Sequence, residues 1–260
     1  MNVVFWVGVK SKDPLTLEKH GNFEYFEYSK KTWKYWCDKN NILFFEYNTP
    51  SLEDVKNHKI TWQRWFDLDN QLKEIKWDKV AVVDASYMIK WDTPNFFKLT
   101  SKNLSVFKSL ENIRWIDEGI QGYKGLFPKV NFDLKKYIDC GFQIFTKDHL
   151  NFLNNLKEFY FNNLDEILKL QSKVGRGTDQ PVYNYLLQDL QVKFGFELPD
   201  SYNLNHMNRF GWFAYNWQLK EDRTPFFIKY GHLWKYSGFD RKQRTPLMQQ
   251  TWNLIKHNYE

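Results

Sequence analysis

An aspartate directly follows an apolar run in the first third of the chain. Residues 79–86 read Lys-Val-Ala-Val-Val-Asp-Ala-Ser, so Asp84 ends the run and Ser86 lies two positions later. A carboxylate just past a buried parallel strand points into the crevice where open α/β sheets bind ligands. Its oxygens suit a divalent cation that neutralises bound phosphates. Asp84 could equally be a helix cap or turn residue, and the run alone leaves both readings open.

A second polar cluster, Asp-Cys-Gly-Phe-Gln-Ile-Phe, occupies residues 139–145. Gly141 has no side chain and would let a ligand approach the backbone closely, next to Asp139. The structural alternative is that Gly141 marks a β-bulge.

A third cluster, Gly-Arg-Gly-Thr-Asp-Gln-Pro-Val-Tyr-Asn, occupies residues 175–184. Asp179 and Gln180 fall in the first turn of a predicted helix, and Asn184 lies four residues after Gln180, on the same helix face. Arg176 lies in a loop flanked by glycines, where it could reach a phosphate or a sugar. Capping alone would explain Asp179, and a surface charge would explain Arg176, but neither explains the whole cluster.

A fourth cluster, Phe-Phe-Ile-Lys-Tyr-Gly-His-Leu-Trp-Lys-Tyr, occupies residues 226–236. Lys229 and Lys235 flank a glycine turn, and cationic side chains around a turn suit a diphosphate. His232 could belong to the same site, or be a surface or core histidine.

The front of the chain alternates the elements that would position these groups. Apolar runs predict strands at 3–9, 42–47 and 77–84, and aromatic residues at helical spacing predict helices at 28–40 and 60–75. This alternation is typical of a parallel α/β sheet. We therefore predict an α/β fold with a mixed, mainly parallel central sheet flanked by helices.

The back of the chain is less regular, and residues 101–130 are rich in glycine and predict loops. The other expected elements are a strand at 137–145, a helix from about 148 to 170, a helix at 180–190, a strand at 226–230 and a closing helix at 246–258. No linker composition separates them, so we expect a single domain over residues 1–260. The aromatic segment 234–252 could cover a site as a lid or pack as core, and core packing is the preferred interpretation.

Composition excludes several classes of protein. The hydrophobic fraction of 42% and the charged fraction of 26% rule out a disordered chain. The 30 Lys against 7 Arg and the scarcity of Ala resemble the bias of an AT-rich genome, so the net charge of +6 indicates a solvated lysine surface first and anionic ligands second. No basic tail or nucleic-acid module is present, and we expect no nucleic-acid partner.

The cysteines and the apolar runs bear on the compartment. Cys37 and Cys140 show no metal-binding or redox spacing, so a reducing cytoplasm is the expected location. The first residues read as a strand, not as a signal peptide. No run of 18 apolar residues occurs, and we therefore expect no membrane span.

The order of the four clusters resembles the glycosyltransferases of the GT-A fold, a Rossmann-like fold, and in particular their glycogenin-like and galactosyl-transferring retaining group. That group has a V-x-x-D-x-D strand end followed by P-x-x-x-F, and here Asp84-Ala85-Ser86 precedes Pro94 and its phenylalanines. Its N-[AS]-G strand is matched loosely at 139–141, its D-Q-x-x-x-N helix fully at 179–184, and its H-x-x-G-x-x-K-P-W segment poorly at 229–236. The resemblance covers roughly residues 1–236.

The resemblance implies transfer of a sugar from a nucleotide-diphosphate donor to a hydroxyl of a glycan, protein or lipid acceptor. Residues 1–100 would form a nucleotide-binding half, 101–236 a sugar and acceptor half, and 237–260 a helical extension. The implied catalytic residues are Asp179 and Gln180, beside the anomeric carbon, with Asp179 as the base if the reaction inverts the configuration. The implied donor-binding residues are Val7, Gly8, Asp84, Ser86, Asp139, Gly141, Arg176, Asn184, Lys229 and Lys235.

Two departures from the group's pattern concern its divalent cation, Mn²⁺ or Mg²⁺. Ser86 replaces the second carboxylate, and an ungapped match puts Lys229 in place of the metal-binding histidine. We therefore expect metal dependence to be weak or absent, with lysine charge replacing the cation. The alternative is that Asp84 and His232 still bind the metal.

Two other functions remain open from the sequence. The degenerate D-x-D motif would fit a non-catalytic nucleotide-sugar or carbohydrate-binding protein on a decayed transferase fold. The basic balance and the many aromatic residues would fit a protein that binds single-stranded nucleic acid.

Overall fold

The computed structural model describes residues 1–10, 23–52, 59–101, 103–109, 112–202, 204, 224–239 and 241–260. The strands in this part of the chain are β1 (Asn2–Val7), β2 (Leu43–Tyr47), β3 (Lys79–Asp84), β4 (Tyr87–Ile89), β5 (Leu104–Lys108), β6 (Ile138–Thr146), β7 (Phe194–Gly195) and β8 (Leu233–Lys235). The α-helices are α2 (Tyr25–Asn40), α3 (Ile60–Gln71), α4 (Ile113–Tyr123), α5 (Leu150–Asn162), α6 (Leu164–Val174), α7 (Gln180–Asp189), α8 (Phe226–Tyr230) and α9 (Arg241–Ile255).

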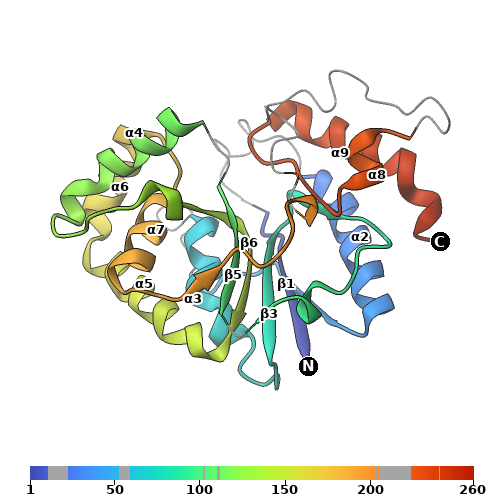
Figure 1. The fold of residues 1–260 in the computed structure, drawn as a ribbon, viewed down its shortest axis with the longest axis horizontal. Coiled ribbons are helices and arrows are strands. Elements are labelled where there is room, and N and C mark those ends of the chain that lie inside the picture. Colours follow the sequence, from blue (N-terminus) through green and yellow to red (C-terminus); the bar gives the residue numbers. More distant parts are fainter. Residues whose placement is uncertain are drawn as a thin grey trace.

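Six strands form a central sheet in the order β2-β1-β3-β6-β5-β7, with helices on both faces (Figure 1). β1 pairs in parallel with β2 and with β3, as the alternation of strands and helices in the sequence predicts. β6 runs antiparallel to its neighbours β3 and β5, and β7 runs parallel to β5. The predicted α/β fold with a mixed, mainly parallel sheet is therefore confirmed.

The sheet separates two hydrophobic cores, and β1 supplies both of them. Val3, Phe5 and Val7 pack on the face covered by α3, α5 and α7, whereas Val4 and Trp6 pack on the face covered by α2 and α9. Successive side chains of a strand point to opposite faces, so a strand between two helical layers must be apolar at every position. This requirement explains the uninterrupted apolar runs that locate β1 and β3 in the sequence.

The antiparallel direction of β6 brings a second polar segment to the edge where β1 and β3 end. Val83 pairs with Phe142 across β3 and β6, so Asp84 and Gly141 follow as neighbours at that edge. Asp139 belongs to the same end of β6. Two of the polar clusters in the sequence thus meet at one edge of the sheet.

A second sheet of two strands lies beside the first and brings in the C-terminal part of the chain. β4 begins three residues after Asp84, and its Tyr87 pairs with Lys235 of β8. The amide of Tyr236 donates a hydrogen bond of 2.9 Å to the Ser86 carbonyl. Trp234 is fully buried and α9 packs on α2, so core packing is the correct interpretation for Trp234 and the helix that follows it.

Two elements differ from those expected. The helix expected from about 148 to 170 is two helices, α5 and α6, because Asn163 leaves the helical backbone conformation and its side chain donates to the Phe159 carbonyl. The strand expected at 226–230 is the helix α8, which begins after Pro225, and the strand comes later, as β8. A short apolar run does not distinguish a buried helix from a strand.

The segment 101–130 contains β5 and α4 and is not a run of loops. Its glycines misled the sequence interpretation because two of them, Gly119 and Gly122, lie inside α4. A Cβ atom on Gly122 would lie 2.5 Å from a methyl group of Val174, so this glycine permits close packing of α4 on α6. Gly122 therefore serves helix packing and not a turn.

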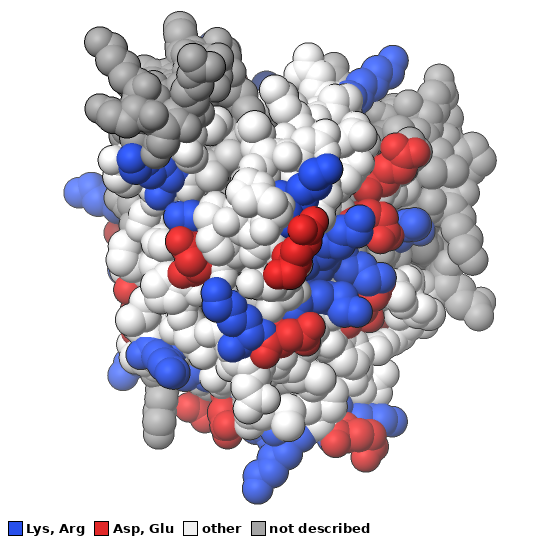
Figure 2. Space-filling view, turned by 90° about the vertical axis from the view of Figure 1, so that its right-hand side faces the viewer, with Lys and Arg blue, Asp and Glu red and all other residues white. Residues whose placement is uncertain are grey.

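The surface on the side of α2 and α9 carries basic and acidic side chains close together over much of its area (Figure 2). On this face the lysine excess therefore resembles a solvated, mixed-charge surface more than a single basic stripe.

Candidate functional site

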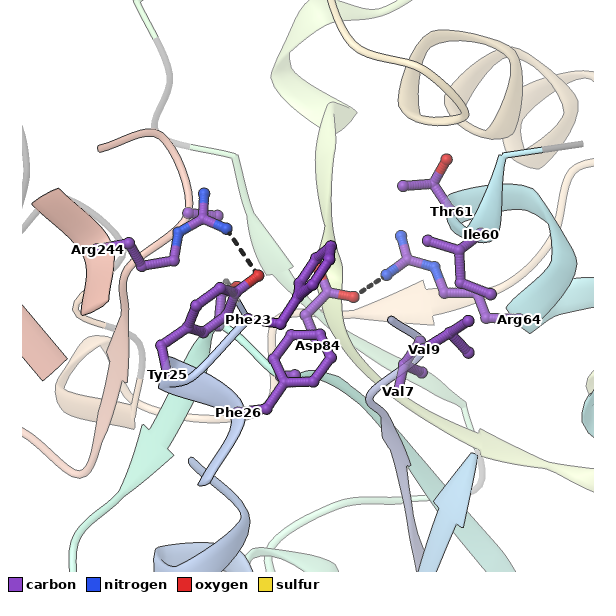
Figure 3. Close-up of a pocket in the computed structure, with 13 residues that line it drawn as sticks. Val7, Val9, Phe23, Tyr25, Phe26, Ile60, Thr61, Arg64, Asp84 and Arg244 are labelled. Atoms are coloured by element: carbon purple, nitrogen blue, oxygen red, sulfur yellow. Dashed lines mark hydrogen bonds and ion pairs between the residues drawn. The ribbon is translucent and has the colours of Figure 1, made fainter. Parts of the chain in front are cut away.

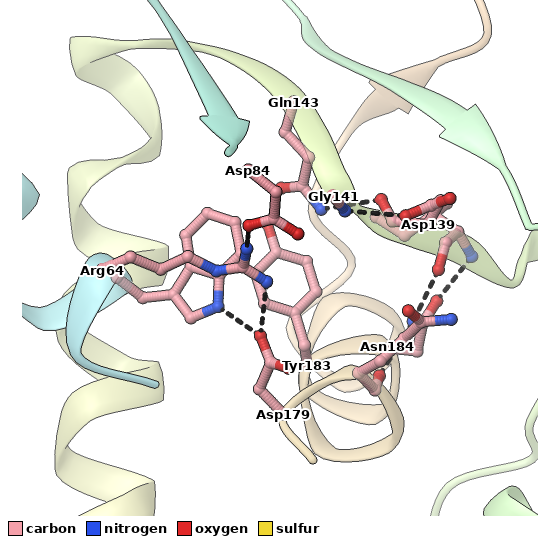
Figure 4. Close-up of polar contacts among 11 residues, drawn as sticks. Arg64, Asp84, Asp139, Gly141, Gln143, Asp179, Tyr183 and Asn184 are labelled. Atoms are coloured by element: carbon pink, nitrogen blue, oxygen red, sulfur yellow. Dashed lines mark hydrogen bonds and ion pairs between the residues drawn. The ribbon is translucent and has the colours of Figure 1, made fainter. Parts of the chain in front are cut away.

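A buried arginine connects the end of β3 to the start of α7. Arg64, on α3, is 2% exposed, and its guanidinium pairs with the carboxylate of Asp84 and, at 2.9 Å, with that of Asp179. The indole of Trp65 donates a second hydrogen bond to Asp179, at 2.8 Å. Figure 4 shows Arg64 between the two carboxylates. Arg64 thereby holds Asp84 and Asp179, which lie 20 and 115 positions away in the sequence, in one cluster.

The charges of this cluster stabilise one another against burial. Burial raises the pKa of Asp84, and the nearby cations of Arg64 and Lys235 oppose that rise. Burial alone would lower the pKa of Arg64, but Asp84 and Asp179 outweigh it and raise that pKa. The guanidinium therefore stays charged, and removal of its charge would leave two carboxylates without their counter-ion.

A second ion pair lies across the cleft from the first. The ammonium of Lys235, at the end of β8, pairs with the buried carboxylate of Asp139. The amide of Gly141 donates to the same carboxylate at 2.7 Å. A Cβ atom on residue 141 would lie 2.9 Å from the ring of Tyr87, so glycine also permits the packing of that ring.

Two adjoining hollows open between these groups, and they share Thr61, Arg64, Asp84 and Ser237 in their walls. The first has a volume of about 230 Å³ and is mainly apolar; its other lining residues are Val7, Val9, Phe23, Tyr25, Phe26, Ile60, Ala85, Ser86 and Arg244. The second has a volume of about 390 Å³ and is mainly polar; its other lining residues are Trp115, Asp139, Cys140, Gly141, Gly177, Thr178, Asp179, Gln180, Lys235 and Gly238. An apolar hollow that adjoins a polar one suits a ligand with a flat apolar end and a polar end.

Arg244 closes the first hollow on the side opposite Arg64 (Figure 3). Its guanidinium donates 3.1 Å hydrogen bonds to the Tyr25 hydroxyl and the Tyr236 carbonyl, and it lies 5.1 Å from the centre of the Tyr25 ring. A fixed guanidinium on the wall of a hollow is a suitable donor for an anion.

Most of the residues named from the sequence lie in this cleft. The residues brought together are Val7, Asp84, Ser86, Asp139, Gly141, Asp179, Gln180 and Lys235. The other candidate residues, Gly8, Arg176, Asn184, Lys229 and His232, line neither hollow.

Gly8 has a packing function. A Cβ atom there would lie 1.8 Å from the ring of Trp6, and that ring is fixed by a 2.9 Å hydrogen bond from its Nε1 to the Ser29 hydroxyl. Contact with Trp6 is sufficient to explain the glycine.

Gly8→Ala should therefore destabilise the fold by about 1–3 kcal/mol, the usual cost of overpacking a core. Urea unfolding measures the effect. Gly125→Ala is the matched control, because a Cβ on Gly125 meets nothing within 4 Å. Equal stability of the two variants would contradict the packing function of Gly8.

Asn184 and Arg176 make contacts away from the cleft. The side chain of Asn184 bonds both backbone groups of Ile138, at 2.8 and 3.1 Å, and so fastens α7 to the start of β6. Arg176 pairs with Glu118 at 2.8 Å on a partly exposed surface. Asn184 thus positions the strand that carries Asp139, and Arg176 makes an ordinary surface ion pair.

Lys229 and His232 lie among a different set of residues from Asp84. Lys229 is on α8, and the backbone carbonyls of Lys229 and His232 accept hydrogen bonds from Lys90. The centre of the His232 ring lies 4.6 Å from that of the Tyr202 ring, and the two rings are tilted by 38°. Burial lowers the pKa of His232, and Lys90 lowers it further.

The residues at the cleft fit a divalent cation poorly. Asp84 is already paired with Arg64, position 86 supplies a hydroxyl in place of a carboxylate, and His232 has other neighbours. Within the described residues, no group of three His, Cys, Asp or Glu could hold a metal ion. Mg²⁺, Mn²⁺ and Ca²⁺ require several oxygen ligands, and the carboxylates of this cleft, Asp84, Asp139 and Asp179, are already paired with Arg64 or Lys235.

A cysteine nucleophile is also disfavoured. Cys140 lies in the second hollow, but burial raises its pKa well above the usual range. A protonated thiol is a weak nucleophile.

Arg64 and Arg244 are the site residues that the sequence interpretation missed. The carboxylate partners of Arg64 are distant in sequence, and Arg244 lies 219 positions from Tyr25, one of its two partners. One signal was available: in a chain with 30 Lys and 7 Arg, an arginine is uncommon enough to merit attention.

None of the helices in the described ranges is both long enough and apolar enough to cross a bilayer.

Comparisons with known proteins bear on the fold. No protein family model matches the chain, and no curated protein matches its sequence. A glycosyltransferase involved in the glycosylation of the major capsid of PBCV-1 matches 95% of this chain and 98% of its own, at 13% identity and a TM-score of 0.59. The galactosyltransferase LgtC, solved with donor and acceptor sugar analogues, matches 98% of this chain and 100% of its own, at 15% identity and a TM-score of 0.46. The central sheet and its helices therefore have the GT-A glycosyltransferase fold.

Proposed function

We propose that this chain, with its GT-A fold, transfers a sugar from a nucleotide-diphosphate donor to an acceptor hydroxyl. The observation that carries the proposal is the convergence of Asp84, Asp179, Gln180, Asp139 and Lys235 on one cleft at the edge where β1 and β3 end. Ligands of open α/β sheets bind at this edge. Structural likeness at 13% identity supports the fold alone. The proposed activity therefore rests on the residues that line this cleft.

The two hollows suggest how the donor lies. The apolar hollow, with Val7 at the end of β1 and Tyr25 at the start of α2, suits a nucleobase, which is flat and weakly hydrated. The polar hollow, with its carboxylates and Gln180, suits a sugar, whose hydroxyls need hydrogen-bond partners. The diphosphate would then lie between them, beside Lys235.

Asp179 is the proposed catalytic carboxylate. Its Oδ2 atom accepts hydrogen bonds from both Arg64 and Trp65, and these two bonds fix its position. A fixed anion beside the anomeric carbon would stabilise the positive charge that develops there as the bond to the diphosphate breaks. Gln180, the next residue in the same hollow, would orient the sugar.

A thermal-shift panel of nucleoside diphosphates and nucleotide sugars tests the binding part of this proposal. One base is expected to raise the unfolding temperature, because a ligand of the native state stabilises it by about 2.7 kcal/mol at 100 times its Kd. Nucleotides with other bases serve as controls. If no nucleotide or nucleotide sugar shifts the transition, the proposed donor site is wrong.

A non-catalytic nucleotide-sugar-binding protein is the second candidate. The observation that favours it is that both ion pairs, Arg64 with its carboxylates and Lys235 with Asp139, are complete without a ligand. Slow release of the nucleoside diphosphate from a nucleotide sugar without acceptor would exclude this candidate. Tight binding without any turnover would support it.

A further inference from the structure

The cleft carries a guanidinium with no carboxylate partner among the described residues. Arg64 is paired with two carboxylates and Lys235 with one, whereas Arg244 donates hydrogen bonds, within the described ranges, to the hydroxyl of Tyr25 and the carbonyl of Tyr236. Both partners of Arg244 are neutral, so its charge is balanced by neither of them. A fixed cation that no described carboxylate neutralises favours an anion in the hollow whose wall it forms.

Lys235 is fixed at the turn that follows β3. Lys235 of β8 pairs with Tyr87 of β4, and the backbone amide of Tyr236 donates a 2.9 Å hydrogen bond to the Ser86 carbonyl. The pairing of two strands therefore sets the position of this ammonium relative to Asp84 and Ser86. Asp139 keeps the ammonium oriented when no ligand is bound.

Arg244 and Lys235 lie where a divalent cation would otherwise be needed to neutralise a bound diphosphate. Arg244 lines the hollow that Ser86 and Ser237 also line, and Lys235 lines the adjoining hollow with Asp84 and Ser237. A diphosphate that crosses from one hollow to the other would pass between a guanidinium and an ammonium. A divalent cation in the same place would meet their positive charge, and the three carboxylates that line the second hollow are already paired with Arg64 or Lys235.

We propose that Arg244 and Lys235 form a clamp for the diphosphate of the nucleotide, and that nucleotide binding here requires no divalent metal. The inference rests on the proposed function and identifies the groups that neutralise its donor. Arg244 would contribute two parallel N–H donors and Lys235 a point charge, and both kinds of contact suit phosphate oxygens.

Isothermal titration with UDP, GDP, ADP and TDP tests the clamp, each in EDTA and again with Mn²⁺ or Mg²⁺. The nucleotide that binds is expected to have the same Kd in EDTA, with Mn²⁺ and with Mg²⁺. Arg244→Met should weaken binding by roughly 10–100-fold, since hydrogen bonds to charged groups contribute that much. Arg244→Lys should retain part of the affinity. Lys256→Met, which removes one charge from an exposed site in the same C-terminal segment, should leave Kd unchanged.

Lys235 needs a variant that does not leave Asp139 as a buried unpaired charge. The double variant Lys235→Met with Asp139→Asn removes both charges and should also weaken binding in EDTA. Adding Ser86→Asp to this double variant tests the converse, because it places a second carboxylate near Asp84 without the ammonium of Lys235, and nucleotide binding should then respond to Mn²⁺.

The outcomes separate this inference from the proposed function. Binding of a nucleotide to the unaltered chain only with Mn²⁺ or Mg²⁺ would overturn the clamp and leave the donor site intact. Wild-type affinity in both the Arg244→Met and the Lys235→Met, Asp139→Asn variants would also overturn it. Failure of all four nucleotides in every condition would contradict the donor site itself.

Discussion

Replacement of Arg64 by methionine is expected to destabilise the protein by about 3–5 kcal/mol, the range measured when one partner of a buried ion pair is removed. Arg64 is the counter-ion of both Asp84 and Asp179, and methionine fills a similar volume without a charge or a donor. Two carboxylates would then share a water-poor cluster, where they repel each other and lack a counter-ion. Urea unfolding followed by fluorescence measures the loss.

Two further variants separate the effect of the lost charge at position 64 from the effect of changed packing. Arg176→Met removes a partly exposed arginine with one surface partner, and its effect should stay within about 0.5 kcal/mol. Adding Asp84→Asn and Asp179→Asn to Arg64→Met removes the orphaned charges and should restore part of the stability. A loss below about 1 kcal/mol in Arg64→Met alone would contradict its function as the central counter-ion.

Asp179→Asn is expected to lower turnover of the nucleotide sugar by about 10²–10³-fold, as loss of one electrostatic stabiliser of a transition state does. Asparagine keeps the shape of the side chain and can still accept from Arg64 and Trp65, but its negative charge is lost. Nucleotide affinity should change little, because Asp179 lines the polar hollow and does not line the apolar hollow assigned to the base.

Asp189→Asn is the matched control for this prediction, since Asp189 ends the same helix α7 and is exposed. Its turnover should equal that of the unaltered protein. The rate must be compared at a temperature where both variants are folded, as judged by their unfolding curves. Turnover of Asp179→Asn within threefold of the unaltered protein would remove Asp179 from the chemistry.

The sequence was sufficient for the front of the fold, for a clear physical reason. β1 and β3 are covered on both faces, and their uninterrupted apolar runs predict parallel strands. The position of Asp84 follows from that prediction, since a residue directly after such a strand lies at the ligand edge. The start of α7, next to Asp179 and Gln180, was also predictable from Pro181 in its first turn.

The parts that failed depend on contacts between distant residues. The run around Lys229 is short and apolar, and such a run does not reveal whether it forms a strand or the helix that it does form. The sequence therefore did not show that Lys235 lines the cleft and that Lys229 does not. Arg64 has no local pattern that marks it, because its partners lie 20 and 115 positions away. The need for a glycine at position 122 is visible only when Val174 of α6 is packed against it.

The central claim is that the cleft at the end of β3 breaks the bond between a sugar and a nucleoside diphosphate. The most direct test is release of the nucleoside diphosphate from a panel of nucleotide sugars, measured for the unaltered protein and for Asp179→Asn. We predict that one donor is consumed by the unaltered protein, faster once an acceptor is supplied, and that Asp179→Asn is nearly inactive on it. Binding of a nucleotide sugar with no consumption, with and without glycan acceptors, would contradict the claim.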